Sequence, residues 1–269
     1  MKNIMKQIIA ATDSEKDGYC RITHKRGWLD FLEDANLPFT PQELHSTFWE
    51  VIDTGQNRPR GDKLLYLRKR YNFTITKDKK PYRTEEALER FITVSNTDDF
   101  FNQVPIGGKK ESIDIGIREG NSKITFVELK AWQSSDSPIY AIVESLKNLT
   151  HYRIIKKRKI KAMNKFDEVE VMILAPLEYY QSYGLLDGEG NKTEDKIKPF
   201  QNILNEFSLA FKTKISFLTL KLDFDNCISK CIEIYDELGV KGQQSVSISI
   251  RHSIPELQRK NWDILLVSS

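Results

Sequence analysis

Apolar and polar residues alternate most regularly between residues 111 and 132, a stretch that reads ESIDIGIREGNSKITFVELKAW. An apolar residue at every second position is typical of a β-strand with one buried face. The polar residues 120–122 interrupt this alternation, and three-residue loops of this kind join antiparallel strands. The pattern therefore predicts a β-hairpin with its turn at residues 120–122.

Segments on both sides of the hairpin carry the periodicities of helices and further strands. Apolar residues at helical spacing predict helices at residues 27–32, 41–52, 84–92, 139–155, 199–211 and 228–238. Short apolar or alternating runs predict strands at residues 100–106, 169–175, 215–222 and 245–250. This mixture predicts an α/β fold in which helices flank a mixed central β-sheet.

Changes in composition along the chain divide it into three predicted regions. Residues 1–80 are expected to form a mainly helical accessory region, which contains the basic residues Arg58 and Arg60. Residues 81–225 are expected to form the core, and residues 226–269 to add a helix and a strand that pack on it. The basic stretch has two interpretations, a solvated helix face or a DNA-binding surface that contacts phosphate groups.

The composition narrows the class of protein only a little. The 269 residues include 41 Lys and Arg against 38 Asp and Glu, and the net charge of +3 permits nucleic-acid binding without establishing it. The three cysteines form no C-x-x-C pair, which argues against a disulfide framework or a cysteine-rich zinc site. No segment reaches the roughly 20 apolar residues of a membrane span, and the start lacks a signal-peptide pattern. We therefore expect a cytoplasmic protein without a membrane partner.

The register of the hairpin follows from its three-residue turn. With residues 120–122 in the turn, Asp114 lies opposite Glu128, and Lys130 follows on the same face. The other face then carries five aliphatic side chains, those of Ile113, Ile115, Ile117, Val127 and Leu129. A turn of two or four residues would instead bring Asp114 onto this aliphatic face and place a charge in the core. The three-residue turn is therefore the prediction.

Two carboxylates on directly opposed residues create a local excess of negative charge. Opposed Cβ atoms lie about 4.5–5.5 Å apart, so Asp114 and Glu128 repel each other unless a cation lies between them. Mg²⁺ and Mn²⁺ prefer such oxygen ligands, and Lys130 could orient or deprotonate a water or stabilise charge on a phosphate. The alternative is an ordinary cross-strand ion pair, because Glu-x-Lys is common by chance and recurs at residues 194–196. The copy at Glu128 differs in lying on a strand whose other face is aliphatic.

These residues resemble the signature of the PD-(D/E)xK nuclease superfamily, which includes many restriction endonucleases and repair nucleases. The matching motifs are SIDIG around Asp114 and VELK at residues 127–130. An acidic helix precedes them, a helix and a strand follow them, and the resemblance covers roughly residues 84–175. Ile113 stands where the name-giving proline would be, as in many members of the superfamily.

The resemblance implies a restriction-endonuclease-like core that hydrolyses phosphodiester bonds, with DNA as the first expectation for the substrate. Asp114, Glu128 and the carbonyl of Leu129 would bind Mg²⁺, for which Mn²⁺ could substitute. Lys130 would position the attacking water. A homodimer is expected only by analogy with restriction enzymes.

Further residues are assigned to the site by the same resemblance. The acid that the superfamily often keeps on the preceding helix matches Glu85 or Glu89, and Glu85 is preferred because it lies at the edge of the helix's buried face. This acid would support the site or bind a second ion. Lys109 and Lys110 would hold the DNA backbone beside the scissile phosphate, or they are solvated loop lysines. Gln133 is also expected to face the site.

Two other classes of function remain open at the level of sequence. The first is a nucleic-acid-binding or interaction protein that keeps the fold without cleaving. The presence of all three residues, Asp114, Glu128 and Lys130, disfavours it, because a silent site would not need them. The second is a nuclease that acts on RNA or on branched or damaged DNA, and no feature of the sequence separates these substrates.

Overall fold

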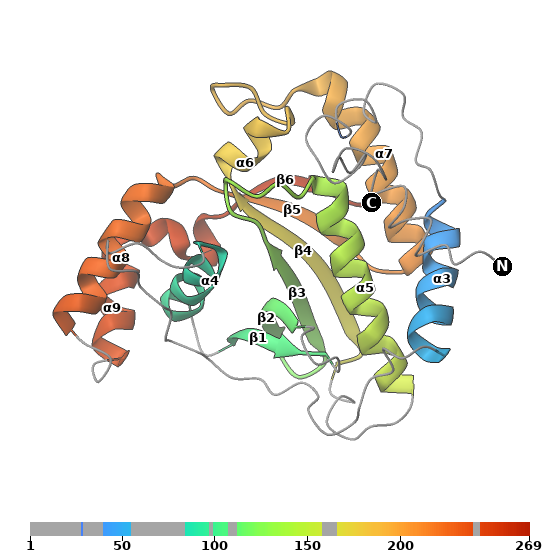
Figure 1. Cartoon of the computed structure of the whole chain (residues 1–269), viewed down its shortest axis with the longest axis horizontal. Coiled ribbons are helices and arrows are strands. Elements are labelled where there is room, and N and C mark those ends of the chain that lie inside the picture. The colour runs from blue at the N-terminus through green and yellow to red at the C-terminus, as the bar shows by residue number, and fades with distance from the viewer. Residues whose placement is uncertain are drawn as a thin grey trace, which may run out of the picture.

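A computed structural model of the chain describes the central sheet and the helices around it (Figure 1). The described residues are 28, 40–54, 84–96, 99–106, 112–157, 166–238 and 243–269. Four basic residues predicted to contact nucleic acid, namely Arg58, Arg60, Lys109 and Lys110, lie outside these ranges. The helix predicted at residues 27–32 also lies outside them, except for the helical residue Trp28.

Six strands form one sheet, and their order across the sheet is their order along the chain. They are β1 (Phe100–Pro105), β2 (Ser112–Glu119), β3 (Lys123–Leu129), β4 (Glu168–Pro176), β5 (Ile215–Leu220) and β6 (Asp263–Val267). Strands β1 to β3 pair antiparallel, β3 to β5 run parallel, and β6 is antiparallel to β5. The prediction of a mixed sheet is confirmed.

Helices cover both faces of this sheet (Figure 1). One face carries α3 (Pro41–Thr54), α5 (Pro138–Lys157) and α7 (Glu194–Phe211), and the other carries α4 (Thr84–Ser95), α8 (Phe224–Leu238) and α9 (Gln243–Ser253). The short helix α6 (Leu177–Ser182) follows β4, and the single 3₁₀ turns η3 (Pro255–Leu257) and η4 (Arg259–Asn261) precede β6. The fold is thus the predicted α/β arrangement of a sheet between helical layers.

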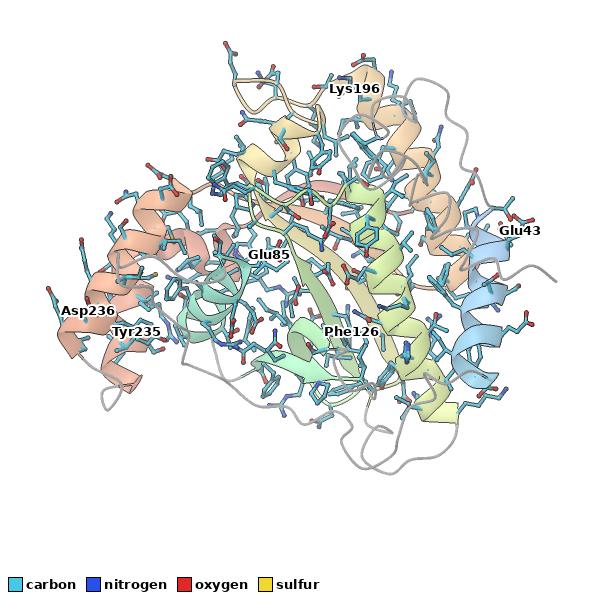
Figure 2. All side chains as sticks on the ribbon, in the orientation of Figure 1. Glu43, Glu85, Phe126, Lys196, Tyr235 and Asp236 are labelled. Atoms are coloured by element: carbon cyan, nitrogen blue, oxygen red, sulfur yellow. The ribbon has the colours of Figure 1, made fainter. Side chains whose placement is uncertain are left out.

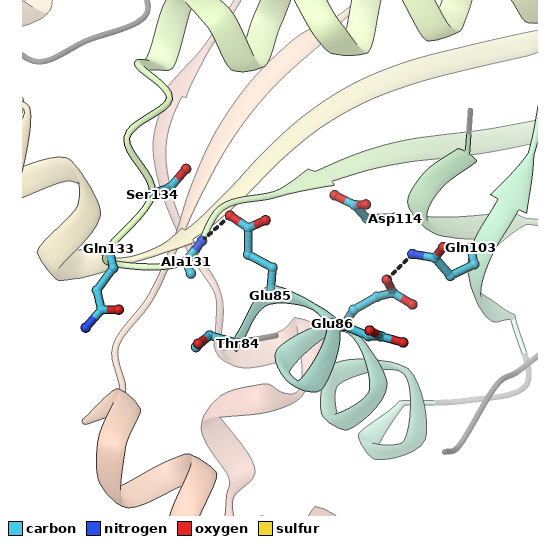
Figure 3. A pocket seen from close by; sticks show the side chains of 9 residues that line it. Thr84, Glu85, Glu86, Gln103, Asp114, Ala131, Gln133 and Ser134 are labelled. Atoms are coloured by element: carbon cyan, nitrogen blue, oxygen red, sulfur yellow. Dashed lines mark hydrogen bonds between the residues drawn. The ribbon is translucent and has the colours of Figure 1, made fainter. Parts of the chain in front are cut away.

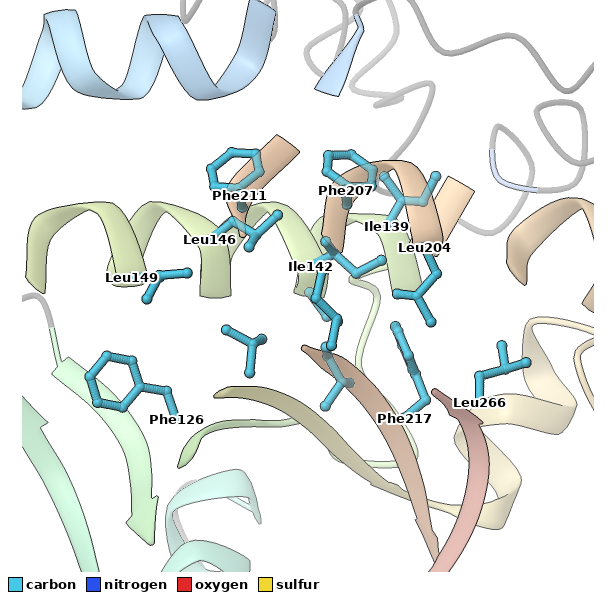
Figure 4. Packing of buried hydrophobic residues seen from close by; sticks show 14 of the residues in the cluster. Phe126, Ile139, Ile142, Leu146, Leu149, Leu204, Phe207, Phe211, Phe217 and Leu266 are labelled. Carbon is cyan, nitrogen blue, oxygen red and sulfur yellow. The ribbon is translucent and has the colours of Figure 1, made fainter. Parts of the chain in front are cut away.

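The larger hydrophobic core lies between the sheet and α5 (Figure 4). Ile142 and Leu146 of α5 and Phe207 of α7 pack over Phe126 of β3 and Phe217 of β5, and all five side chains are buried. Helix α3, which comes from the predicted accessory region, packs against α5 and α7 within this same cluster. We call it the α5 cluster.

A second core, the α4 cluster, lies on the other side of the sheet. Leu88 and Phe91 of α4 pack there with Val127 and Leu129 of β3 and Cys231 of α8. Neighbouring residues of β3 therefore point into different cores, and the strand is covered on both faces. A strand in this position is nearly continuously apolar, which explains the apolar run of β4 as well.

The helices predicted at residues 41–52, 84–92, 139–155, 199–211 and 228–238 are confirmed, although α7 and α8 begin earlier than predicted, at Glu194 and Phe224. The predicted strand at residues 245–250 is wrong. This segment, SVSISI, lies within helix α9. Val246 and Ile250 lie one helical turn apart and are buried in the α4 cluster, whereas Ile248 between them is 47% exposed. Packing of one helix face against α4 and α8 therefore overrides the local strand pattern.

The strand that ends the sheet is β6, which the sequence reading missed. Its sequence, DILLV, is short and carries no clean alternation. Its pairing with β5 also shifts register between Phe217 and Leu218, so that Leu265 and Leu266 both become buried in the α5 cluster. An irregular edge strand of this kind has no period-two signal to detect.

In helix α9, Ile248 is exposed and Ile250 is buried, whereas in a strand both side chains would lie on the same face. Mutations at the two positions should therefore change stability unequally. Replacing the buried Ile250 by Ala should lower the free energy of unfolding by about 2–4 kcal/mol, because a cavity forms in the α4 cluster. The same change at the exposed Ile248 should cost less than about 0.5 kcal/mol. Urea unfolding of both variants measures the difference, and equal losses would show that the segment is not helical.

Candidate active site

Asp114 lies where the β2–β3 ladder ends. Backbone pairing of β2 with β3 keeps the predicted register up to the pair of Ile115 and Val127. One step further, the N–H of Leu129 donates a hydrogen bond of 2.9 Å to Asp114 Oδ2. A side-chain carboxylate thus replaces the main-chain acceptor at the point where the two strands separate. The next pair in this register would set Asp114 opposite Glu128, as predicted.

One prediction about the faces of the hairpin is wrong. Ile113 was expected on the same face as Ile115, but it packs in the α5 cluster, whereas Ile115 packs in the α4 cluster. The change of face falls at Asp114 and at Gln103, its counterpart in the register of β1 and β2. Gln103 has a φ of +49°, a left-handed backbone conformation that few residues other than glycine adopt. Asp114 therefore lies at the crossing point between the two sides of the sheet.

Helix α4 holds the unusual backbone at Gln103 in place. The Gln103 amide Nε2 donates a hydrogen bond of 2.5 Å to Glu89, and its Oε1 accepts a bond of 3.3 Å from the Ser112 hydroxyl. Glu89 is buried and also accepts a hydrogen bond from Arg90. Uncommon backbone conformations of this kind gather at functional sites, where the surrounding structure stabilises them.

The two candidate helical acids have different surroundings. Glu85 lies at the start of α4 (Figure 2). It accepts a hydrogen bond of 3.1 Å from the N–H of Ala131, immediately after Lys130 (Figure 3). Glu89 is engaged with Gln103 and Arg90, as described above. The preference for Glu85 over Glu89 as the supporting acid remains a prediction, and the contact with the end of β3 favours it.

A cavity of about 580 Å³ opens between α4 and the ends of β2 and β3 (Figure 3). Its lining residues are Thr84, Glu85, Glu86, Glu89, Gln103, Asp114, Ala131, Gln133 and Ser134. Four of these nine residues are acids, and the lining contains no Lys or Arg. Asp114, Glu85 and Gln133 thus line one cavity, whereas Glu128 and Lys130 are not among its lining residues.

Lys130 lies on the α5 side of the sheet and contacts three carboxylates. Its ammonium Nζ is 2.9 Å from Glu128, 3.2 Å from Glu144 and 3.3 Å from Asp136. The residue is only 3% exposed. Glu144 comes from α5 and Asp136 from the loop that precedes it, so the structure adds two acids to the predicted set.

The surroundings of Lys130 determine its protonation. Burial by itself would lower the pKa of the ammonium, but the nearby charges of Glu128, Glu144 and Asp136 outweigh burial and raise that pKa well above its ordinary value of 10.5. Lys130 is therefore a cation at neutral pH and cannot accept a proton. Of the predicted roles, the structure favours orienting a water or stabilising negative charge over deprotonating a water.

The carboxyls of Asp114 and Glu128 are both harder to ionise than ordinary acids. The pKa of Asp114 is raised from 3.8 to about 7, chiefly by burial. The charges of Glu85 and Glu144 add to this rise, and the hydrogen bond from Leu129 and the charge of Lys130 oppose it. Burial also raises the pKa of Glu128 well above 4.5, with a further contribution from the charge of Asp114. The charge of Asp114 thus acts on Glu128 across the end of the hairpin.

Sequence reasoning missed the two further acids around Lys130. Glu144 lies between Val143 and Ser145, away from the apolar stripe of α5, and nothing local marks it as part of a site. Asp136 lies among several candidate helix caps, but the cap is Ser137, whose hydroxyl oxygen accepts a bond from the Tyr140 N–H. Only the tertiary packing of α5 on β3 reveals the role of these acids.

Two tyrosines of the α6 region fix the loop between Lys130 and α5. The Tyr179 hydroxyl donates to the carbonyl of Asp136 at 2.8 Å, and the Tyr183 hydroxyl donates to the carbonyl of Ser134 at 3.2 Å. The indole N–H of Trp28 donates to the carbonyl of Tyr183 at 2.8 Å. The loop beside Lys130 is therefore anchored to the α6 region, which Trp28 contacts in turn.

The donor atoms fit the predicted Mg²⁺ chemically, because Asp114 and Glu128 supply carboxylate oxygens. In a strand, the N–H and C=O of one residue lie on the same edge, so we expect the Leu129 carbonyl to open toward the gap that holds Asp114. Across the described ranges, no three His, Cys, Asp or Glu side chains form a metal-binding group. The predicted set differs from such a group, since it combines two carboxylates with a main-chain carbonyl.

Comparisons of the chain with family models, curated proteins and solved structures found no match. No helix in the described part of the chain combines the length and the apolar character that a membrane crossing requires.

The raised pKa of Asp114 predicts that its charge destabilises the metal-free fold. Between pH 3.8 and about 7 the native carboxyl keeps a proton that the unfolded chain has released, so stability falls as the pH rises through this window. Asp114→Asn keeps an acceptor for Leu129 and removes the charge. At pH 8 in EDTA it should raise the free energy of unfolding by about 1–2 kcal/mol, and the gain should vanish near pH 4.

The matched control is Asp99→Asn, which removes an acid paired with Arg118 at 2.8 Å on the surface. That change should be neutral or should lower stability by up to about 1 kcal/mol. Urea unfolding between pH 4 and pH 8 measures both variants. Destabilisation by Asp114→Asn at pH 8 would mean that the carboxylate stabilises the fold and is not held there against a cost.

Proposed function

We propose that the chain is a metal-dependent nuclease that resembles PD-(D/E)xK enzymes and cleaves DNA internally. The observation that carries the proposal is that Asp114 is bonded to the N–H of Leu129, next to Glu128, which in turn contacts the buried ammonium of Lys130. Buried ionisable groups are costly to the fold, and acids with strongly raised pKa values gather where chemistry requires them. The finer fold proposal, a restriction-endonuclease-like core, is supported by the mixed sheet between α4 and α5.

The carboxylates would form the metal site. Asp114 and Glu128 would bind Mg²⁺ or Mn²⁺, joined by the main-chain carbonyl of Leu129. When bound, such an ion stabilises charge on phosphate oxygens and lowers the pKa of a coordinated water. The carboxyls would give up their protons on binding, and the positive charge of the ion would offset the repulsion between the two carboxylates. Glu85 would support this arrangement through its bond to the N–H of Ala131.

Lys130 would act as a fixed cation. Its raised pKa keeps it protonated, so it would donate hydrogen bonds to the attacking water or to phosphoryl oxygens and would not remove a proton. The charge on the phosphate grows as the phosphorus–oxygen bond forms, and a preoriented ammonium in a buried setting stabilises it strongly.

The residues proposed to bind DNA were predicted from the sequence alone. Arg58, Arg60, Lys109 and Lys110 would contact the phosphate backbone, and binding would then weaken as the salt concentration rises. The acidic lining of the cavity beside Asp114 suits cations better than bare phosphate groups. A homodimer is proposed by analogy with restriction enzymes alone, and a cytoplasmic location is proposed from the sequence.

Cleavage assays test this function directly. Supercoiled plasmid, single-stranded DNA, RNA and a branched duplex are incubated with the protein in Mg²⁺, Mn²⁺ or EDTA. We expect cleavage of DNA with either ion and none in EDTA. Asp114→Asn and Lys130→Ala should each lower the rate by roughly 10²–10⁴-fold, because each removes a group that acts on the reacting phosphate.

The chain offers a matched control for the Lys130 variant. Lys196 ends a second Glu-x-Lys tripeptide, which lies in α7 far along the chain from the site, and Lys196→Ala should cleave like the wild type. Cleavage that survives both Lys130→Ala and EDTA would contradict the mechanism. Cleavage of RNA or branched DNA alone would keep the mechanism and change the substrate, whereas binding without cleavage would favour a silent member of the fold.

A further inference from the structure

The ammonium of Lys130 has its full set of hydrogen-bond partners within the protein. An ammonium carries three N–H donors, and three carboxylates lie within 3.3 Å of Lys130 Nζ. These acids are Glu128, Asp136 and Glu144. With every donor directed at a carboxylate, the ammonium has none left for a water or a phosphate. The arrangement must therefore change before Lys130 can act on a substrate.

The three acids come from three different parts of the fold. Glu128 belongs to β3, Asp136 to the loop before α5, and Glu144 to the second turn of α5. Glu128 is the acid that the proposed function also assigns to the metal ion. A carboxylate that binds a divalent ion has less negative charge to offer a neighbouring ammonium. Ion binding thus weakens one of the three contacts and leaves those of Asp136 and Glu144.

We propose that Glu144 is a positioning residue that holds the Lys130 ammonium in place once Glu128 turns to the metal ion. The inference rests on the nuclease function proposed above and adds a residue outside the Asp and Glu-x-Lys motifs. Glu144 contributes the 3.2 Å contact, and with Asp136 it leaves one N–H of Lys130 to face the substrate. Glu128 releases that donor by turning to the ion.

The setting of Glu144 suits this role better than that of Asp136. Helix α5 is 20 residues long, and Ile142 and Leu146 on either side of Glu144 are fully buried in the α5 cluster. The backbone that carries Glu144 is therefore rigid relative to β3. Asp136 lies in a loop and depends on the Tyr179 hydroxyl, which holds its carbonyl at 2.8 Å. Glu144 fixes the direction of the ammonium, and Asp136 assists it.

Glu144→Gln tests the role, because it keeps the shape of the side chain and removes its charge. In cleavage assays at saturating Mg²⁺, kcat should fall about 10–100-fold, because a displaced catalytic group loses rate steeply. The substrate KM and the midpoint of the Mg²⁺ titration should each change far less than kcat, because in this proposal Glu144 is neither a substrate contact nor a metal ligand. In a Lys130→Ala background, Glu144→Gln should lower kcat no further, because Glu144 acts through Lys130.

Glu170→Gln is the matched control. Glu170 lies on β4 and pairs with Lys123 at 2.8 Å, a Glu–Lys contact between neighbouring strands at the other end of β3. The control variant should cleave like the wild type. An unchanged kcat in Glu144→Gln would overturn the inference. A Mg²⁺ midpoint raised tenfold with kcat intact would overturn it too, because Glu144 would then be a metal ligand.

A stability measurement tests the contact between Glu144 and Lys130 independently of nuclease activity. If the wild type cleaves nothing under any condition, the nuclease proposal fails, and the Lys130–Glu144 contact is then tested by unfolding. A double-mutant cycle with Lys130→Met and Glu144→Gln should show that the two changes are strongly non-additive in the urea midpoint. Additive shifts would show that Glu144 does not hold Lys130, whatever the protein does.

Discussion

The buried ammonium of Lys130 is the interaction on which the rest of the site depends. A cation that is 3% exposed persists only if carboxylates match it, and Glu128, Asp136 and Glu144 supply that match from three elements. The three carboxylates together carry more negative charge than the single ammonium can neutralise. Burial raises the free-energy cost of this excess negative charge. Burial is the main cause of the raised pKa values of Asp114 and Glu128, and the neighbouring carboxylate charges add to it. A bound divalent cation would neutralise the excess negative charge. The charges that destabilise the metal-free fold are therefore the ones that would bind the proposed metal ion.

The backbone provides the other constraint, because the site needs carboxylates from both sides of the sheet. The change of face at Gln103 and Asp114 lets one strand residue interact with Glu85 on the α4 side and Glu144 on the α5 side. The separation of β2 from β3 then opens the gap that Asp114 fills through its bond to the Leu129 N–H. A regular hairpin would have placed Asp114 on one face only.

Most of the fold could be predicted from sequence because its central elements carry local signals. The hairpin register followed from the turn, and α5 and β4 followed from their apolar patterns. The wrong and missed predictions have a common physical cause, because tertiary packing determines the structure at these positions. Segment 245–250 is helical because Val246 and Ile250 pack together in the α4 cluster, and Glu144 joins the site only through the docking of α5. A left-handed residue at Gln103 has no signal in its own sequence, so the displacement of Ile113 could not be foreseen.

The central claim is that Asp114 and Glu128 jointly hold a divalent ion beside Lys130. Crystals soaked in Mn²⁺ test it most directly, because anomalous scattering locates the ion without reference to activity. The account predicts one strong peak within about 2.0–2.3 Å of an oxygen from each carboxylate, with Lys130 still in contact with Glu144. A peak elsewhere, or none at millimolar Mn²⁺ with the Lys130–Glu128 pair intact, would contradict the account.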